Sequence, residues 1–173
     1  MQLSFDAAKR REAGQRLAQQ PGREVKVAAK SGKRGPITVE DLAPRIDHAL
    51  RNIDNRIELN RSPLLRLAAV ERLAEARFAD CIHPGAVALR QILRQAVSET
   101  LREMEDDPAL LRMRQFLELY AAGASVTAAS EHLGLSREHC SRVLKRRAVR
   151  LVAEKFSRLA HCRRGVPVRL LAC

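Results

Sequence analysis

Apolar residues recur at every third or fourth position from Thr38 onward, and this spacing predicts a series of amphipathic helices. The first helix carries a seam of apolar residues whose spacing is typical of a helix bundle: Leu42, Ile46, Leu50, Ile53 and Ile57. Ser62-Pro63 is a typical helix start, and His83-Pro84-Gly85 and Pro108 separate the later helices. The predicted helices therefore cover residues 38–57, 62–78, 87–104 and 109–123, which indicates an all-α helical bundle.

A different pattern follows over residues 125–151, where a short helix, a glycine and a second helix succeed one another. The first helix has an inward stripe formed by Val126, Ala129, Ser130 and Leu133. Gly134 suits a turn because glycine adopts positive φ freely, Leu135 closes the corner, and Ser136 is a typical N-cap. This layout predicts a C-terminal helix-turn-helix whose second helix covers residues 136–150 and continues to about His161.

The second helix of this unit has two chemically different sides. Cys140, Val143 and Leu144 recur at helical spacing and are predicted to face inward. The residues predicted to face outward are Arg137, Glu138, Ser141, Arg142 and Lys145. Arginine can bond to guanine O6 and N7 together, and glutamate can accept a hydrogen bond from cytosine N4. The outward side therefore suits contacts with the base edges and phosphates of DNA.

Residues Leu135 to Arg146, LSREHCSRVLKR, closely resemble the recognition helix of the Crp/Fnr family, whose pattern is LSRETVSRVLKRL. His139 and Cys140 stand where that family has Thr and Val. The resemblance implies that base edges are read by Arg137, Glu138 and Arg142. The residues expected to contact the DNA backbone are Ser141, Lys145, Arg146, Arg147 and Arg150.

The resemblance is confined to this segment. A Crp/Fnr protein has a β-barrel ligand domain before the motif and a β-wing after it, whereas residues 146–160 continue the helical pattern. The helical surround is more similar to region 4 of bacterial sigma factors or to the LuxR-type output domain. We therefore expect membership of the helix-turn-helix superfamily without assigning a family within it.

Charge is concentrated at the two ends of the chain. The net charge is +12, with +6 in residues 1–37, −2 in residues 38–121 and +8 in residues 122–173. A polyanionic partner is expected from this balance. Residues 1–37 are predicted to form a flexible basic arm. Either this arm contacts DNA through Lys30, Lys33 and Arg34, or its charge only aids solubility. The remaining division is a central helical module over 38–107, a DNA-binding domain over 108–161 and a tail over 162–173.

Several other classes of protein are disfavoured by the sequence. No apolar run approaches the length of about 18 residues that a membrane span needs, and the N-terminus lacks the apolar core of a secretory signal. A cytoplasmic protein with no membrane partner is therefore expected. The four cysteines lack the paired spacing of structural zinc sites, which favours free thiols and no metal. Because no phosphate-binding glycine loop or nucleophile-base constellation is recognisable, we predict neither an enzyme nor a cofactor.

The expected function is that of a sequence-specific transcriptional regulator that inserts helix 136–150 into the major groove of double-stranded DNA. The long apolar seams of the central module motivate the hypothesis that it forms a homodimer. One alternative is a sigma-like factor whose central helices contact RNA polymerase. Another is a helical adaptor of a nucleoprotein or mobile-element complex that binds DNA without sequence preference.

Overall fold

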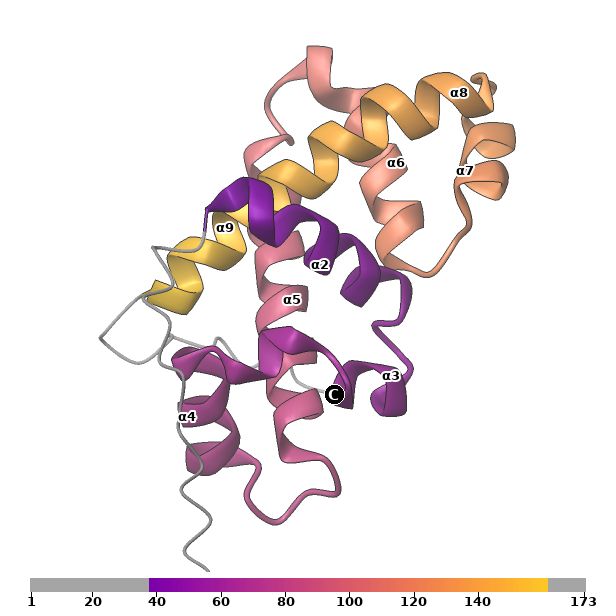
Figure 1. Ribbon diagram of the computed structural model, residues 1–173. Coiled ribbons are helices and arrows are strands. Elements are labelled where there is room, and N and C mark those ends of the chain that lie inside the picture. The colour runs from indigo at the N-terminus through magenta and orange to yellow at the C-terminus, as the bar shows by residue number, and fades with distance from the viewer. Residues whose placement is uncertain (1–37, 162–173) are drawn as a thin grey trace, which may run out of the picture. The chain divides into compact units, whose positions relative to one another are not determined.

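The computed structural model describes residues 38–161, and every regular element in this range is helical. The predicted all-α fold is confirmed (Figure 1). The helices are α2 (Val39–Arg51), α3 (Arg56–Asn60), α4 (Ala68–Arg77), α5 (Pro84–Glu103), α6 (Leu111–Ala121), α7 (Val126–Leu133), α8 (Arg137–His139) and α9 (Arg146–His161). Three short segments complete them: 3₁₀ turns at Pro63–Arg66 and Pro108–Leu110, and a π-helical segment at Cys140–Lys145. The predicted arm, with Lys30, Lys33 and Arg34, and the predicted tail lie outside the described residues.

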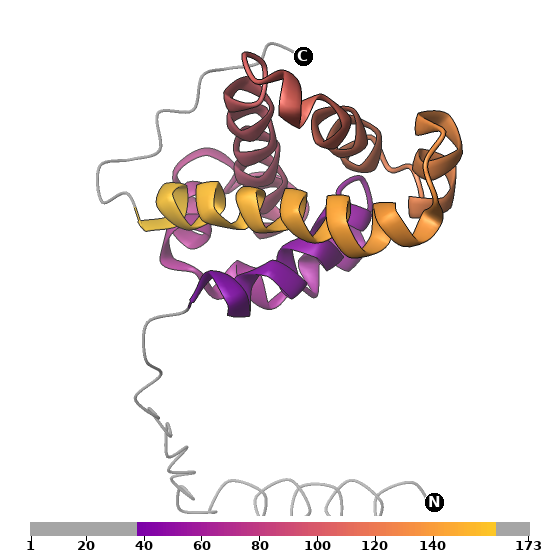
Figure 2. The same ribbon diagram turned by 90° about the horizontal axis from the view of Figure 1, so that it is seen from above.

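Helix α9 lies at the centre of this arrangement. It crosses the molecule with α2 on one side and α5 on the other, and α4 packs against α5 (Figure 2). The side chains that α9 buries are Ala148, Val149, Val152, Ala153, Lys155, Phe156 and Leu159. Burial of a Val, Leu or Phe side chain contributes about 1.5–3 kcal/mol each, against about 1 kcal/mol for a helix cap. Packing therefore contributes more than capping to the stability of α9.

A single hydrophobic core runs through the described residues. It includes Leu42 and Ile46 of α2 and Leu93 of α5 together with Phe116 of α6 and Phe156 of α9. The sequence segments 38–107 and 108–161 therefore share one core. The seam of α2, which motivated the homodimer hypothesis, is covered by the chain's own helices, so a second copy would need another surface.

The first predicted helix is wrong at its C-terminal end. It begins as predicted at Thr38, whose side chain accepts a hydrogen bond from Asp41 N in a capping box. It ends at Arg51, where the Asn52 side chain donates to His48 O, and Asn55 then caps α3. Asparagine competes for backbone hydrogen bonds and so favours helix ends. As a consequence Ile57 leaves the seam and is 61% exposed.

The second predicted helix is also interrupted. Ser62 caps a 3₁₀ turn that starts at Pro63, as expected from a serine-proline start, but Leu67 is extended and separates this turn from α4. The third and fourth helices follow the prediction more closely, as α5 and α6. Within residues 38–161, no helix combines the length and the apolar character needed to cross a bilayer.

The central place of α9 predicts a large effect of truncating its buried aromatic residue. We expect Phe156→Ala to lower the free energy of unfolding by about 3–5 kcal/mol, because it leaves a cavity in the hydrophobic core. Leu111→Ala is the control, since Leu111 is exposed and its loss is expected to cost less than about 0.5 kcal/mol. Urea unfolding measures both variants. Similar losses in the two would contradict a core centred on α9.

Candidate nucleic-acid interface

The turn between α7 and α8 is fixed by local hydrogen bonds. Gly134 has φ +62°, Gly134 N donates to Glu131 O at 3.2 Å, and Leu135 N donates to Ser130 O at 3.0 Å. This pair of bonds is the Schellman motif that ends a helix at a left-handed residue. The Ser136 side chain then accepts a hydrogen bond from His139 N at 3.1 Å and caps the next helix. The predicted roles of Gly134 and Ser136 are both confirmed.

The inner side of α7 packs as its sequence pattern predicts. Ala129, Ser130 and Leu133 are buried, and Val126 is partly buried against the same core. Ser130 Oγ donates to Thr127 O at 2.7 Å, which satisfies the buried hydroxyl within the helix. These contacts hold α7 against α6 and against the helical run that begins at α8.

A second link joins the end of α7 to α6. Arg112 of α6 places Nη1 3.4 Å from Leu133 O, one of the carbonyl groups left free where α7 ends. The C-terminus of α7 is therefore held both by its own turn and by a side chain from the preceding helix.

The π-helical segment Cys140–Lys145 changes which residues of the second helix face the core. A π-helical turn has i→i+5 hydrogen bonds and more residues per turn than an α-helix. Side chains four positions apart consequently form rows along the helix. One row is buried: Cys140, Leu144, Ala148 and Val152. The row on the opposite side, Glu138, Arg142, Arg146 and Arg150, is exposed.

The prediction that Val143 faces inward is therefore wrong. It lies in the row of His139 and Arg147, and its side chain is 45% exposed. The prediction holds for Cys140 and Leu144, which are buried. In an α-helix Val143 and Leu144 both lie close to the side that Cys140 faces, one on each flank. The wider π-helical turn moves Val143, three positions on, farther from that side and keeps Leu144, four positions on, near it.

The residues predicted to read bases are all exposed. Arg137, Glu138 and Arg142 lie on the solvent side, and Arg142 Nη1 is 2.8 Å from Glu138 Oε1. Two of the three are thus paired with each other across one helical turn. Such an exposed pair contributes about 0.3–0.5 kcal/mol and is readily exchanged for another partner.

The residues predicted to contact the DNA backbone are in different environments. Ser141, Arg146 and Arg147 are exposed, and neither arginine forms a salt bridge within the described part of the chain. Arg150 is also exposed, but its guanidinium lies 3.5 Å from Glu40 of α2 and 3.4 Å from Glu154.

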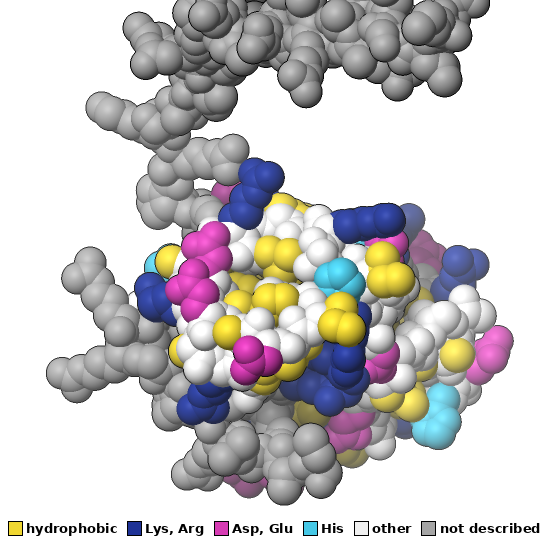
Figure 3. Space-filling view, turned by 90° about the horizontal axis from the view of Figure 1, so that it is seen from below, with side chains coloured by type: hydrophobic (Ala, Val, Ile, Leu, Met, Phe, Trp, Pro, Cys, Tyr) yellow, Lys and Arg dark blue, Asp and Glu magenta, His cyan; other side chains and the backbone are white. Residues whose placement is uncertain are grey.

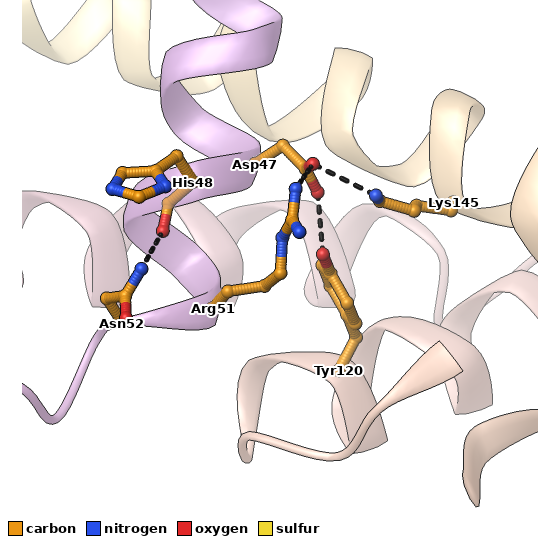
Figure 4. Close-up of polar contacts among 6 residues, drawn as sticks. All are labelled: Asp47, His48, Arg51, Asn52, Tyr120 and Lys145. Atoms are coloured by element: carbon orange, nitrogen blue, oxygen red, sulfur yellow. Dashed lines mark hydrogen bonds and ion pairs between the residues drawn. The ribbon is translucent and has the colours of Figure 1, made fainter. Parts of the chain in front are cut away.

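Lys145 does not face outward as predicted, because it joins a polar cluster between three helices. Its Nζ lies 2.9 Å from Asp47 Oδ2 of α2 and 5.8 Å from the ring centroid of Tyr120 of α6 (Figure 4). The Tyr120 hydroxyl donates to Asp47 Oδ1 at 2.6 Å, and Arg51 pairs with Asp47 Oδ2. The side chains of Lys145 and Asp47 are only 21% and 15% exposed. We call Asp47, Arg51, Tyr120 and Lys145 the Asp47 cluster.

Burial and hydrogen bonding have opposite effects on the pKa of Asp47. Burial by itself raises the pKa of a carboxyl, but hydrogen bonds from Tyr120, Lys145 and Arg51 outweigh this and lower the pKa of Asp47 below its usual value. Burial, together with the hydrogen bond to Asp47, raises the pKa of Tyr120 far above its usual value. At neutral pH the cluster therefore holds one carboxylate, a neutral phenol and two cations.

Sequence reasoning did not find the Asp47 cluster. Asp47 lies beside the apolar seam of α2, and its partners Tyr120 and Lys145 are far away in the chain. No spacing rule joins positions on three different helices. The presence of a single tyrosine in a chain with few aromatic residues was the only available signal, and it names no partner.

Elsewhere on the described residues, side chains of one chemical type do not gather in a single patch. The face at the lower end of Figure 1, where α3, α4 and the start of α5 lie, has basic, acidic and apolar side chains next to one another (Figure 3). Cys140 is a buried thiol whose pKa is raised by burial. No three His, Cys, Asp or Glu side chains in residues 38–161 come together as a metal site would require.

Comparison with known proteins identifies no relative of this chain. No protein-family model, curated protein or solved structure matches the chain.

The Asp47 cluster predicts a stability difference between two aspartates that each contact two basic residues. We expect Asp47→Asn to lower the free energy of unfolding by about 1–3 kcal/mol, because partly buried donors lose their charged acceptor. Asp54→Asn is the matched control. Asp54 pairs with Arg90 and Arg94 but is 64% exposed, so a loss below about 1 kcal/mol is expected. Chemical denaturation at pH 7 measures the unfolding free energy of both variants. Equal losses would contradict the conclusion that Asp47 contributes more to stability than an exposed aspartate.

The lowered pKa of Asp47 also predicts a dependence on pH. A carboxyl with a lower pKa in the folded state stabilises the fold above its unfolded pKa of about 4, and this stabilisation is lost as pH falls through the folded pKa. The difference in unfolding free energy between wild type and Asp47→Asn should be constant between about pH 5 and 7 and shrink below about pH 4. A difference that stayed unchanged at low pH would contradict this assignment.

Proposed function

We propose that residues 125–150 form a helix-turn-helix unit that binds double-stranded DNA, with the helix from Arg137 to Arg150 in the major groove. On this proposal the protein is a sequence-specific transcriptional regulator. The observation that supports it best is the exposed row Glu138, Arg142, Arg146 and Arg150 on a helix whose opposite row is buried. A helix held in this way presents a polar, mainly basic face that fits the width of the major groove.

The turn supports the same proposal. The Schellman motif at Gly134 and the Ser136 cap fix the turn that leads from α7 into the second helix. In known helix-turn-helix units the N-terminal residues of the second helix contact base edges. Arg137, Glu138 and Arg142 occupy that part of the helix, so they are the proposed base-reading residues.

The charge along the helix supports a polyanionic partner. Between Arg137 and Arg150 there are six basic residues and one acidic residue, Glu138. Arg146 and Arg147 make no salt bridge within residues 38–161, so their guanidinium groups are free to contact phosphates. Together with Ser141 they are the proposed backbone contacts. Arg150 joins them when it exchanges Glu40 and Glu154 for a phosphate.

Lys145 has another role in this proposal. Its ammonium group is held by Asp47 over the ring of Tyr120, so it links the proposed DNA-reading helix to α2 and α6. We therefore assign Lys145 to the positioning of the helix, and we assign the phosphate contacts to its exposed neighbours.

Selection from a random duplex library with the full-length protein tests the proposal. We expect a defined site, and we expect Arg142→Ala to reduce the preference for the correct base at one position of that site by about 1–3 kcal/mol, the usual value of a bidentate base contact.

Arg147→Ala should instead weaken binding to all sequences and reduce the slope of log K against log salt by about 0.9, the value for one phosphate.

The matched control is Arg94→Ala, which removes an exposed arginine of α5 and should leave affinity and site preference unchanged. Equal affinity for all duplexes would contradict sequence-specific binding and favour the adaptor alternative. Binding that required RNA polymerase would favour the sigma-like alternative. A palindromic site would point to a homodimer.

A further inference from the structure

Val143 is an apolar residue in the middle of an otherwise polar and basic surface. Its neighbours along the exposed rows are His139, Arg142, Arg146 and Arg147, all of them exposed. The exposed large apolar residues of the described chain are Ile57, Ile82, Leu111 and Val143, and Val143 alone among these four belongs to the proposed DNA-reading helix. Its exposure follows from the π-helical segment, which turns it away from the side that buried Cys140 faces.

The surroundings of Val143 limit what it can bind. An apolar surface that docks another protein usually extends over several hundred Å². A single valine ringed by arginine and histidine offers a much smaller apolar target. Its side chain is short and β-branched, so little rotamer freedom is lost when it is buried. A target of similar size is one methyl group surrounded by acceptors and phosphates.

We propose that Val143 recognises the C5 methyl group of a pyrimidine in the major groove, which in unmethylated DNA is thymine. This inference rests on the proposed DNA binding and adds a specificity-determining residue to it. Thymine is the base that displays a methyl group in the major groove, and small apolar side chains contact it there. Val143 and Arg142 are both exposed on this helix, so the thymine belongs to the same selected site as the base that Arg142 reads.

Deoxyuridine substitution tests the proposal, because it removes only the C5 methyl group. In the site selected by the full-length protein, each thymine is replaced in turn by deoxyuridine. We expect one position, or one in each half of a symmetric site, at which the wild type binds about fourfold more weakly. This factor corresponds to about 0.8 kcal/mol for one buried methyl-sized group.

Two variants show whether Val143 causes the loss. In Val143→Ser both methyl groups of the side chain are absent, and the thymine and deoxyuridine duplexes should bind equally at that position. Val143 is exposed and serine has a similar helix propensity, so the fold should be retained. Ile82→Ala removes an 80% exposed isoleucine from the loop between α4 and α5, and this variant should keep the fourfold preference.

The outcomes separate this inference from the function on which it rests. A selected site at which no deoxyuridine weakens binding, or a preference that persists in Val143→Ser, overturns the role of Val143 and leaves DNA recognition intact. Failure to select any site overturns the proposed function itself, and the role of Val143 falls with it.

Discussion

The burial of α9 between α2 and α5 is the interaction on which the remaining structure depends. Residues 137–161 form one continuous helical run, whose C-terminal part supplies much of the core and whose N-terminal part presents basic side chains to solvent. Because both parts belong to one helix, the packing of Phe156 and Val152 sets the direction in which Arg142 points. The core and the proposed interface are therefore parts of one rigid element.

The Asp47 cluster strengthens the link between the core and the proposed interface, at the place where the helical run 137–161 leaves the core. A carboxylate from α2, a phenol from α6 and an ammonium group from the π-helical segment meet there. A half-buried carboxylate is costly unless several donors surround it, and Tyr120, Lys145 and Arg51 provide them. An apolar contact would tolerate small rotations of the helix, whereas these directional bonds favour one orientation. The cluster thus helps to fix the orientation of the helix as well as to stabilise the fold.

The elements that sequence predicted best are those governed by short-range rules. Ser62 and Ser136 cap helical segments, and Gly134 takes the left-handed conformation, because each depends on neighbours a few positions away. The inward stripe of α7 follows from simple periodicity.

The predictions failed where other interactions compete with that periodicity. Asn52 ended α2 before Ile57, since its side chain bonded to the backbone. The π-helical segment turned Val143 outward, although α-helical spacing places it close to the side that Cys140 faces. Lys145 found a partner on a helix far away in sequence. The proposed base-reading residues are exposed as expected, and their partner on the nucleic acid stays a prediction.

The continuity of the helical run also determines what kind of binding reaction this surface would support. Its backbone is ordered from Arg137 onward by the turn, the cap and the core behind it, so association would restrict only side chains such as those of Arg142 and Arg147. The entropic penalty of folding a recognition segment upon contact is absent from such a reaction. On the proposed function, such a surface would bind as a rigid body, and the heat-capacity change of binding would reflect the area buried in the complex, with no contribution from coupled folding of the helix.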